Sequence, residues 1–318
     1  MQRRNSQMTR RELLVSGVGV GAAVGLGVLP STGAAEGDDA GWIDAHSHIW
    51  GRDVAEFPLA NGNTLDDLSP QSFTTEELFA VCEPVGVKRV VLIQHHIYHG
   101  WDNSYLVHEA ARFPQRLRVV GMVDDRGKSP GLAMRSLLKQ HVTGFRITSR
   151  IQGREQWLSG DGMREMWQTA AETGQAMCCL IDPADLVGVD AMCAQHPATK
   201  VVIDHFARIG ADGEIRSKDV DQLCRLARHP AMYVKISAYY ALGKKQPPYH
   251  DLVPMIRRLL DAFGPERLMW ASDAPYQLDG EHTYAASLAL IRDHLSDLSD
   301  GDRNWLLRKT AAGVYFFQ

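Results

Sequence analysis

The feature of this sequence that most restricts its fold is a series of eight short apolar runs, each followed by a longer stretch with helical periodicity. Alternation of this kind is typical of βα units on a parallel sheet, and eight such units can close into a barrel. The sequence therefore predicts a (β/α)8 barrel. Its predicted strands are Trp42–Ala45, Arg89–Ile93, Leu117–Val123, Val142–Ile147, Ala176–Ile181, Lys200–Ile203, Met232–Ile236 and Arg267–Ala271.

The predicted strands form one uninterrupted series. No Pro/Ser-rich linker and no internal repeat divides them, so we expect a single domain over residues 36–318. An open, doubly wound sheet is the alternative fold. No Gly-rich dinucleotide loop follows the first run, however, and this absence favours the barrel.

Residues 1–35 have the three parts of an export signal: a basic start, an apolar stretch over residues 13–29 and a small-residue end. The pair Arg10 and Arg11 resembles a twin-arginine signal, which predicts a periplasmic or otherwise extracytoplasmic location. An uncleaved membrane anchor is the alternative, although the apolar stretch is short and Gly-rich for a spanning helix. After cleavage we expect no membrane association, because no later segment is apolar enough to span a bilayer.

The charge of the chain indicates its class of partner, and the spacing of its cysteines indicates their state. The chain has a net charge of −4 and no Lys/Arg-rich run after the signal, which argues against a nucleic-acid partner. We expect a small-molecule substrate, and a homo-oligomer stays open. The five cysteines lack the paired spacing of a zinc ribbon or a disulfide scaffold, so buried thiols are favoured.

Polar residues end most of the predicted strands. In a barrel of this kind the active site lies at the carboxyl ends of the strands, so these residues are the candidates for function. One polar residue at a strand end is usually only the start of a loop, but many at the same end predict a site. The candidates are His46, His48, Gln94, His95, His96, Asp124, Arg146, Asp182, Asp204, His205, Ser237, Tyr239 and Asp273.

The most informative candidates are two histidines separated by one residue. Alternate side chains of a strand share a face, so we expect His46 and His48 to project together while Ala45 and Ser47 face away. Two such imidazoles can bind one divalent cation. Closure of the barrel makes the last strand a neighbour of the first, so Asp273 would lie beside the pair as a ligand or as the base for a water. A helix N-cap or turn residue is the alternative for Asp273.

Several stretches of the chain resemble the successive strand motifs of the amidohydrolase-related family, which includes sugar lactonases, dicarboxylate lactonases and aminocarboxymuconate semialdehyde decarboxylase. The resemblance covers essentially the whole chain after the signal. It implies a hydrolase acting on a lactone, ester or amide-like bond, with decarboxylation or non-catalytic metabolite binding as alternatives. The stretches that carry it are residues 42–50, 144–146, 202–205, 234–237 and 272–275.

The resemblance implies a metal site formed by His46, His48 and Asp273, with His205 as a further ligand or as an acid/base. The sequence departs from the fuller amidohydrolase pattern, because Arg146 replaces a bridging lysine and strand five ends without a histidine. At most one divalent metal is therefore expected, zinc with manganese as the alternative, and metal-free hydrolysis stays open. The predicted catalytic residues are Asp273, His205 and Arg146.

Substrate contacts are predicted at the same mouth. Arg146 can hold a substrate carboxylate with two hydrogen bonds, although a structural ion pair is an equal alternative. Aromatic residues near the mouth can bind ring-shaped groups. The predicted substrate-binding residues are Gln94, His96, Arg146, Tyr239 and Tyr276.

Strand alternation makes two further predictions. The adjacent side chains of Asp204 and His205 should point to opposite faces, and we expect only His205 to face the site. A hydrogen-bonded core histidine is the alternative for His205. Lys235 should face inward and deep in the barrel, where we expect it to pair with a buried acid such as Asp44.

Overall fold

The computed structural model describes residues 41–317. These residues belong to one compact unit, Asp38–Gln318. The predicted export signal over residues 1–35 lies outside the described residues, so the signal and the domain boundary after it stay predictions. Within residues 41–317, every helix is too short or too polar to cross a membrane.

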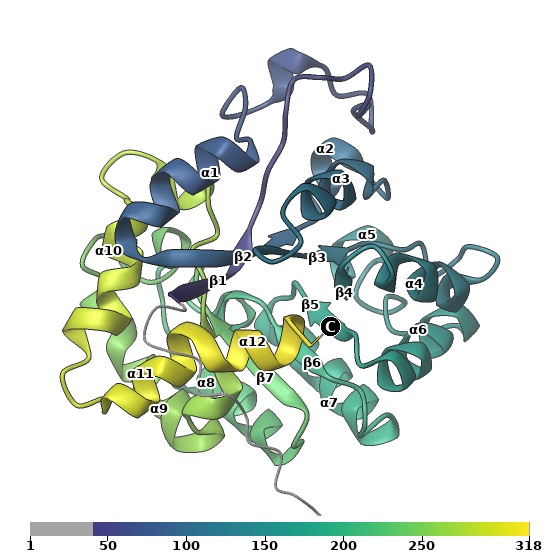
Figure 1. Cartoon of the computed structure of the whole chain (residues 1–318). Coiled ribbons are helices and arrows are strands. Elements are labelled where there is room, and N and C mark those ends of the chain that lie inside the picture. The colour runs from purple at the N-terminus through teal and green to yellow at the C-terminus, as the bar shows by residue number, and fades with distance from the viewer. Residues whose placement is uncertain (1–40, 318) are drawn as a thin grey trace, which may run out of the picture. The chain divides into compact units, whose positions relative to one another are not determined.

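Eight parallel strands follow one another in chain order around a nearly closed barrel, with helices between them (Figure 1). The predicted (β/α)8 barrel is confirmed. Every predicted strand is present, and its ends differ from the prediction by two residues or fewer. The strands are β1 Trp42–Ser47, β2 Val87–Ile93, β3 Leu117–Gly121, β4 Val142–Ile147, β5 Ala176–Cys179, β6 Val201–Ile203, β7 Met232–Ile236 and β8 Leu268–Trp270.

Helices cover the outside of the barrel. The first of them is capped by Thr74, whose hydroxyl accepts from the N–H of Glu77, while the Glu77 carboxylate accepts from the N–H of Thr74. The α-helices are α1 Thr75–Cys82, α2 His96–His99, α3 Ser104–Arg112, α4 Pro130–Leu138, α5 Ser149–Gln152, α6 Asp161–Thr173, α7 Leu186–Gln195, α8 Ser217–Arg225, α9 Val253–Phe263, α10 Tyr284–Ala289, α11 Asp300–Asn304 and α12 Thr310–Tyr315.

The strands are buried on both faces, which explains why their sequences are nearly continuous apolar runs. One hydrophobic cluster lies between the strands and the helices, and a second fills the barrel interior. Helix α12 crosses the strands in Figure 1 and joins the interior cluster through Ala311, Val314 and Tyr315. The Phe316 ring lies under Arg89 and Arg118, early in β2 and β3. The end of the chain therefore covers the amino ends of the strands and leaves their carboxyl ends available for a site.

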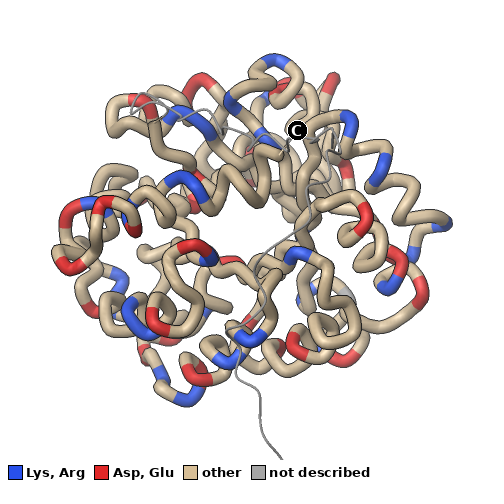
Figure 2. Tube along the Cα trace, turned by 60° about the horizontal axis from the view of Figure 1, so that its bottom comes forward, with Lys and Arg blue, Asp and Glu red and all other residues tan. Residues whose placement is uncertain are grey.

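Charged residues are interspersed around the ring of helices. Figure 2 shows lysine and arginine mixed with aspartate and glutamate, and this view has no face of a single sign. A polyanion-binding surface would gather basic residues on one face. The expected small-molecule partner stays a prediction.

The barrel closes between β1 and the segment that follows β8. Ser47 pairs with Ala274 in a parallel bridge. The N–H of Asp273 donates to the carbonyl of His46 at 2.8 Å, and the N–H of His48 donates to the carbonyl of Ala274 at 2.7 Å. These bonds bring the two ends of the barrel sequence together at the predicted site.

Candidate active site

Strand β1 contains an irregularity that decides where its histidines point. Between Asp44 and Ser47 it has one more residue than the facing part of β2, which is a β-bulge. Ala45 lies in the interior cluster, so the expectation that it faces away is wrong. The bulge resets the alternation, and His46 and His48 still project together into the barrel mouth.

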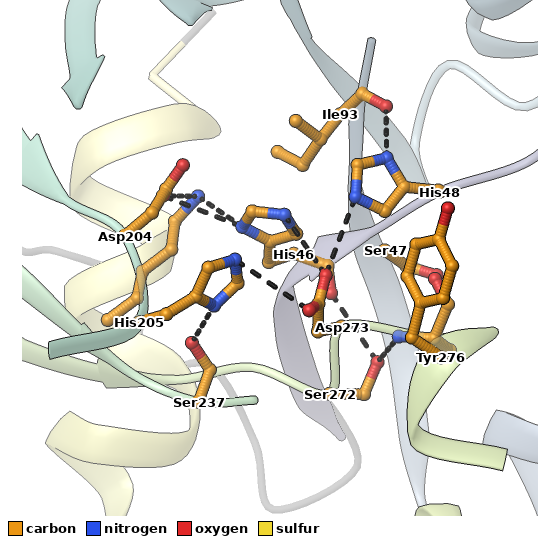
Figure 3. Close-up of polar contacts among 12 residues, drawn as sticks. His46, Ser47, His48, Ile93, Asp204, His205, Ser237, Ser272, Asp273 and Tyr276 are labelled. Atoms are coloured by element: carbon orange, nitrogen blue, oxygen red, sulfur yellow. Dashed lines mark hydrogen bonds and ion pairs between the residues drawn. The ribbon is translucent and has the colours of Figure 1, made fainter. Parts of the chain in front are cut away.

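The side chains of His46, His48, His205 and Asp273 converge at the carboxyl end of the barrel (Figure 3). The Nε2 atoms of His46 and His48 each lie 3.4 Å from Asp273 Oδ1, and Nε2 of His205 lies 3.8 Å from Asp273 Oδ2. All four residues are buried. The structure thus brings together the residues predicted to bind a metal, whose roles stay predictions.

Outer hydrogen bonds fix the imidazole rings of His48 and His205. Nδ1 of His48 lies 2.9 Å from the carbonyl oxygen of Ile93. A carbonyl oxygen only accepts, so Nδ1 carries the hydrogen and Nε2 presents its lone pair to Asp273. Nδ1 of His205 lies 2.8 Å from Ser237 Oγ, which also leaves Nε2 facing the carboxylate.

His46 lies above a buried ion-pair cluster. Asp204 Oδ1 lies 3.1 Å from Lys235 Nζ, and Asp204 Oδ2 accepts from Arg146 Nη2 at 3.2 Å. Arg146 Nη2 also lies 2.8 Å from His46 Nε2, while Lys235 Nζ lies 3.3 Å from His46 Nδ1. A neutral imidazole accepts at only one nitrogen. The shorter contact assigns the acceptor role to Nε2, so the Nδ1–H of His46 faces Asp204, 3.5 Å away.

Burial keeps the clustered histidines neutral. It lowers the pKa of His48 to about 3, with a further contribution from Arg146. Burial and the charge of Lys235 hold the pKa of His46 well below its usual range, and burial also lowers the pKa of His205. Neutral imidazole is the form that binds a metal or accepts a proton.

The two carboxylates of the site differ in their electrostatics. Burial raises the pKa of Asp273, and His205 and the Tyr240 hydroxyl, which donates to Oδ2 at 2.8 Å, partly offset this effect. Burial acts in the same direction on Asp204, but Lys235 and its other neighbours hold the pKa of Asp204 well below the usual range. Asp273 is therefore the better base, and Asp204 is a fixed counter-ion.

Both Asp204 and His205 face the site, against the expectation that only His205 does. Asp204 follows the alternation of β6, in which Val202 faces the interior. His205 has a φ of 52°, and this left-handed conformation turns its side chain back toward the barrel mouth. A change of backbone conformation thus places two consecutive side chains in one cluster.

Lys235 pairs with a buried acid, as expected, but this acid is Asp204 and not Asp44. Asp44 precedes the bulge of β1 and faces the outside of the barrel. There its Oδ2 accepts from the hydroxyls of Ser272 at 2.5 Å and Tyr284 at 2.6 Å. Asp44 therefore stabilises the junction between β1 and the segment after β8.

These groups open into a cavity of about 650 Å³, a size that suits a small molecule. The family model for amidohydrolases matches residues 43–317. The chain belongs to the amidohydrolase family. It is a hydrolase, and the sequence resemblance to this family is confirmed.

Two curated relatives of this amidohydrolase are lactone hydrolases by name. It is 28% identical to the L-fucono-1,5-lactonase of Burkholderia ambifaria, over 78% of this chain and 85% of that protein. It is 26% identical to the 4-sulfomuconolactone hydrolase of Rhizobium radiobacter, over 73% of this chain and 75% of that protein. A crystal structure of an amidohydrolase from Burkholderia multivorans with bound zinc superposes with a TM-score of 0.71 at 23% identity, covering 88% of this chain and 100% of that one. This last similarity shows the fold.

Three of the residues predicted to bind substrate line the cavity of the amidohydrolase, namely His96, Arg146 and Tyr276. Arg146 also makes the ion pair that was its alternative role, since its Nη2 donates to Asp204. The ion pair with Asp204 therefore fixes the Arg146 guanidinium before any substrate binds.

Gln94 and Tyr239 lie away from the cavity wall, although both were predicted to bind substrate. The Gln94 side chain is buried and donates to backbone carbonyls of the loop that follows β2. Tyr239 is buried and donates to the carbonyl of Ile236 at 2.9 Å. Ala238, with a φ of 58°, starts a tight turn that brings Tyr240 to the cavity in place of Tyr239.

Tyr276 is held by a histidine that is not part of the central cluster. Nε2 of His95 lies 2.5 Å from the Tyr276 hydroxyl, and Nδ1 of His95 is buried without a hydrogen-bond partner. Burial lowers the pKa of His95 to about 2, so the ring is neutral. Buried N–H groups without an acceptor are rarer than unpaired acceptors, which places the hydrogen on Nε2. The Tyr276 hydroxyl then accepts from His95 and has its own proton free for the cavity.

Proposed function

We propose that this amidohydrolase hydrolyses the ring ester of a small-molecule lactone. The observation that carries the proposal is the convergence of His46, His48 and His205 on Asp273, a buried base that lines a substrate-sized cavity. The names of the two curated relatives, both lactone hydrolases, support the same reaction.

One divalent metal fits this cluster. The ligand atoms of His46, His48 and Asp273 lie within 4.8 Å of one another. The two Nε2–Oδ1 distances of 3.4 Å match the roughly 3.3 Å between ligands in tetrahedral zinc sites, where bonds are about 2.0–2.1 Å long. Metal binding at His46 Nε2 would require the Arg146 guanidinium to move away from this nitrogen. We propose zinc, with manganese as the alternative, and the zinc found in the Burkholderia multivorans amidohydrolase supports this choice.

A second metal does not fit. The ligand atoms of His46, Asp204 and His205 form another candidate group among residues 41–317. Lys235 Nζ already lies 3.1 Å from Asp204 and 3.3 Å from His46, so its ammonium supplies the cation that this group requires. A single metal is the most that the site would hold.

The residues of the chain supply the proton transfers and charge stabilisation. A bound metal would polarise the lactone carbonyl and lower the pKa of a water. Asp273, held by the Tyr240 hydroxyl, takes a proton from the water whose oxygen forms the new bond to the carbonyl carbon. Arg146 and the free hydroxyl proton of Tyr276 stabilise the negative charge that develops on oxygen. Asp273 then returns the proton to the ring oxygen as its bond to the carbonyl carbon breaks, which gives a hydroxy acid.

The test combines metal content with turnover. The full chain, expressed in zinc- or manganese-supplemented medium, is assayed by elemental analysis and with a panel of sugar lactones, γ-lactones and aryl esters. We expect lactone hydrolysis with at most one metal per chain. His48→Gln should lower metal content and turnover together if the enzyme uses a metal, whereas His108→Gln, at a half-exposed histidine outside the cavity, is the matched control. Release of carbon dioxide from an unsaturated acid without any lactone turnover would contradict the proposal.

A further inference from the structure

The two sides of the cavity differ in their chemistry. The groups proposed to act on the lactone lie at the ends of β1, β6 and β8, where His48, His205 and Asp273 line the cavity. In a closed ring of eight strands, β4 and β5 lie across from β1 and β8. The segments after β2, β3, β4 and β5 each contribute one large apolar side chain to the cavity. These four residues, here called the apolar wall, are Ile97, Met122, Ile151 and Leu180.

The apolar wall is separate from the hydrophobic core. Among residues 41–317, the outer and interior core clusters include none of its four members. Two of them are exposed, Ile97 by 62% and Ile151 by 37%. Single exposed apolar side chains are common on protein surfaces, but several that line one cavity mark a binding site. A ligand that covers Ile97 and Ile151 would remove apolar surface from water, which is favourable.

A small void lies beside the apolar wall. Met122 and Ile151 border both the main cavity and this void, whose volume of about 20 Å³ has room for roughly one water molecule. The lining of the void includes the apolar side chains of Trp101, Trp157 and Met163. A methionine side chain has three rotatable bonds and adapts to irregular spaces. Met122 therefore has space to move when an apolar group enters the main cavity.

The polar side chains beside the apolar wall have partners within the protein. The Thr148 hydroxyl accepts from the N–H of Arg150 at 3.3 Å and caps α5. Asp182 Oδ1 lies 3.2 Å from Arg208 and 3.6 Å from Arg150, so the two guanidinium groups share one carboxylate. A substrate hydroxyl placed against the apolar wall would exchange hydrogen bonds with water for contacts with hydrocarbon, which costs free energy. This side of the cavity thus favours a hydrocarbon group.

We propose that the substrate is a lactone whose ring carries an alkyl chain, and that the apolar wall binds this chain while the ring ester faces Asp273. The inference rests on the proposed lactone hydrolysis and names its substrate class. The cavity of about 650 Å³ has room for both the ring and the chain. Each methylene group of the chain that the wall removes from water should strengthen binding by roughly two- to four-fold.

The test uses γ-butyrolactones that carry a methyl, butyl or hexyl chain, and the hexyl lactone with hydroxyl groups on the first two carbons of its chain. Turnover is measured with the full chain, and binding is measured by calorimetry with its Asp273→Asn variant. We expect kcat/KM and affinity to rise by roughly two- to four-fold per methylene group, and to fall when the hydroxyl groups are added.

Exposed positions of the apolar wall can be changed at little cost to folding. Ile97→Ala and Ile151→Ala should each lower kcat/KM for the hexyl lactone on the order of 3- to 10-fold, and the loss should shrink as the chain is shortened to methyl. Leu132→Ala is the matched control, at a leucine of α4 that is 66% exposed and lies outside the cavity. It should leave the dependence on chain length unchanged.

A polar replacement should reverse the preference. Ile151→Asn should weaken binding of the hexyl lactone and improve binding of its hydroxylated counterpart, an opposite pair of effects that structural damage would not produce. A wild type that prefers the hydroxylated chain, or a chain-length dependence that the Ile97 and Ile151 variants leave unchanged, would overturn the apolar wall while lactone hydrolysis stands. Binding that grows with chain length and depends on Ile151, without turnover of any lactone, would instead contradict the proposed hydrolysis and support the apolar site. Absence of both binding and turnover would overturn both proposals.

Discussion

Replacement of Asp273 by asparagine is the most direct test of the chemistry of this site. Oδ1 of Asp273 lies 3.4 Å from Nε2 of His46 and His48, and Oδ2 accepts from Tyr240. Asparagine keeps the shape and one oxygen but removes the charge and the basic oxygen. Losing a general acid/base lowers turnover by roughly 10²–10⁴-fold, which is about 2.7–5.4 kcal/mol in the activation barrier.

The same substitution should barely change folding. Asp273 has a φ of 66°, a left-handed conformation that asparagine adopts more readily than most residues. Burial raises the pKa of Asp273, so the folded protein does not favour its ionised form and loses little when the charge is removed. Asp273→Ala is the contrasting variant, because the left-handed conformation is costlier for alanine and the Tyr240 hydroxyl loses its acceptor. We expect alanine to destabilise the fold by about 1–3 kcal/mol more than asparagine.

The assay measures kcat/KM on a lactone that the wild type hydrolyses, with the unfolding free energy and metal content determined on the same samples. The expected result for Asp273→Asn is a large loss of turnover with a change in unfolding free energy of less than about 1 kcal/mol. If this variant kept near-wild-type turnover, Asp273 would be a turn residue and the base would have to be sought elsewhere, first at His205. A large loss of stability would refute the conformational argument instead.

Three further predictions follow from contacts around the site. Tyr276→Phe removes the hydroxyl that faces the cavity, so kcat/KM should fall about 10- to 100-fold. It also removes the acceptor of the buried His95 Nε2–H, so the free energy of unfolding should fall by about 1–3 kcal/mol. An unaltered rate in the folded variant would exclude the hydroxyl from the reaction. Burial lowers the pKa of His48 to about 3 and that of His95 to about 2 in the folded protein, below the usual 6.5. As the pH falls below 6.5, the unfolded chain therefore takes up protons at these histidines before the folded protein does. Urea unfolding should show the free energy of unfolding falling by about 1.4 kcal/mol per pH unit for each histidine between pH 6 and 5. Lys235→Met leaves the charge of Asp204 without its ammonium and should cost about 3 kcal/mol of unfolding free energy, a loss that Asp204→Asn in the same chain should partly restore.

The barrel could be predicted from the sequence because its strands are buried on both faces. Strands β4 and β7 have the predicted bounds, since their apolar runs begin and end with the pairing of the strand. Strand β5 ends at Cys179, two residues before its predicted end at Ile181. Ile181 is nevertheless buried in the outer core. Apolarity reports burial, which continues beyond the last paired residue, so strand ends are the least certain part of such a prediction.

The partners of the site residues could not be predicted in the same way. Strict alternation misses the bulge of β1, and for this reason Lys235 was assigned to Asp44 when it pairs with Asp204. A polar residue at a strand end is a candidate for the site by its position alone, yet Gln94 and Tyr239 are used for local backbone contacts. The acid that pairs with Lys235 comes from another strand, and the roles of Gln94 and Tyr239 depend on how the chain turns after each strand.

The departures from alternation share one location. His205, Ala238 and Asp273 follow the last residues of β6, β7 and β8, all three have positive φ, and all three line the cavity. A strand that continued with alternating side chains would send every second group into the surrounding helices. A left-handed residue instead turns the chain across the barrel mouth, so that His205 and Asp273 meet above the buried pair of Asp204 and Lys235. The left-handed residues after three successive strands thus allow a regular barrel to bring acid, base and cation together at one point. They also explain why strand alternation fails to predict side-chain directions at the site and succeeds elsewhere.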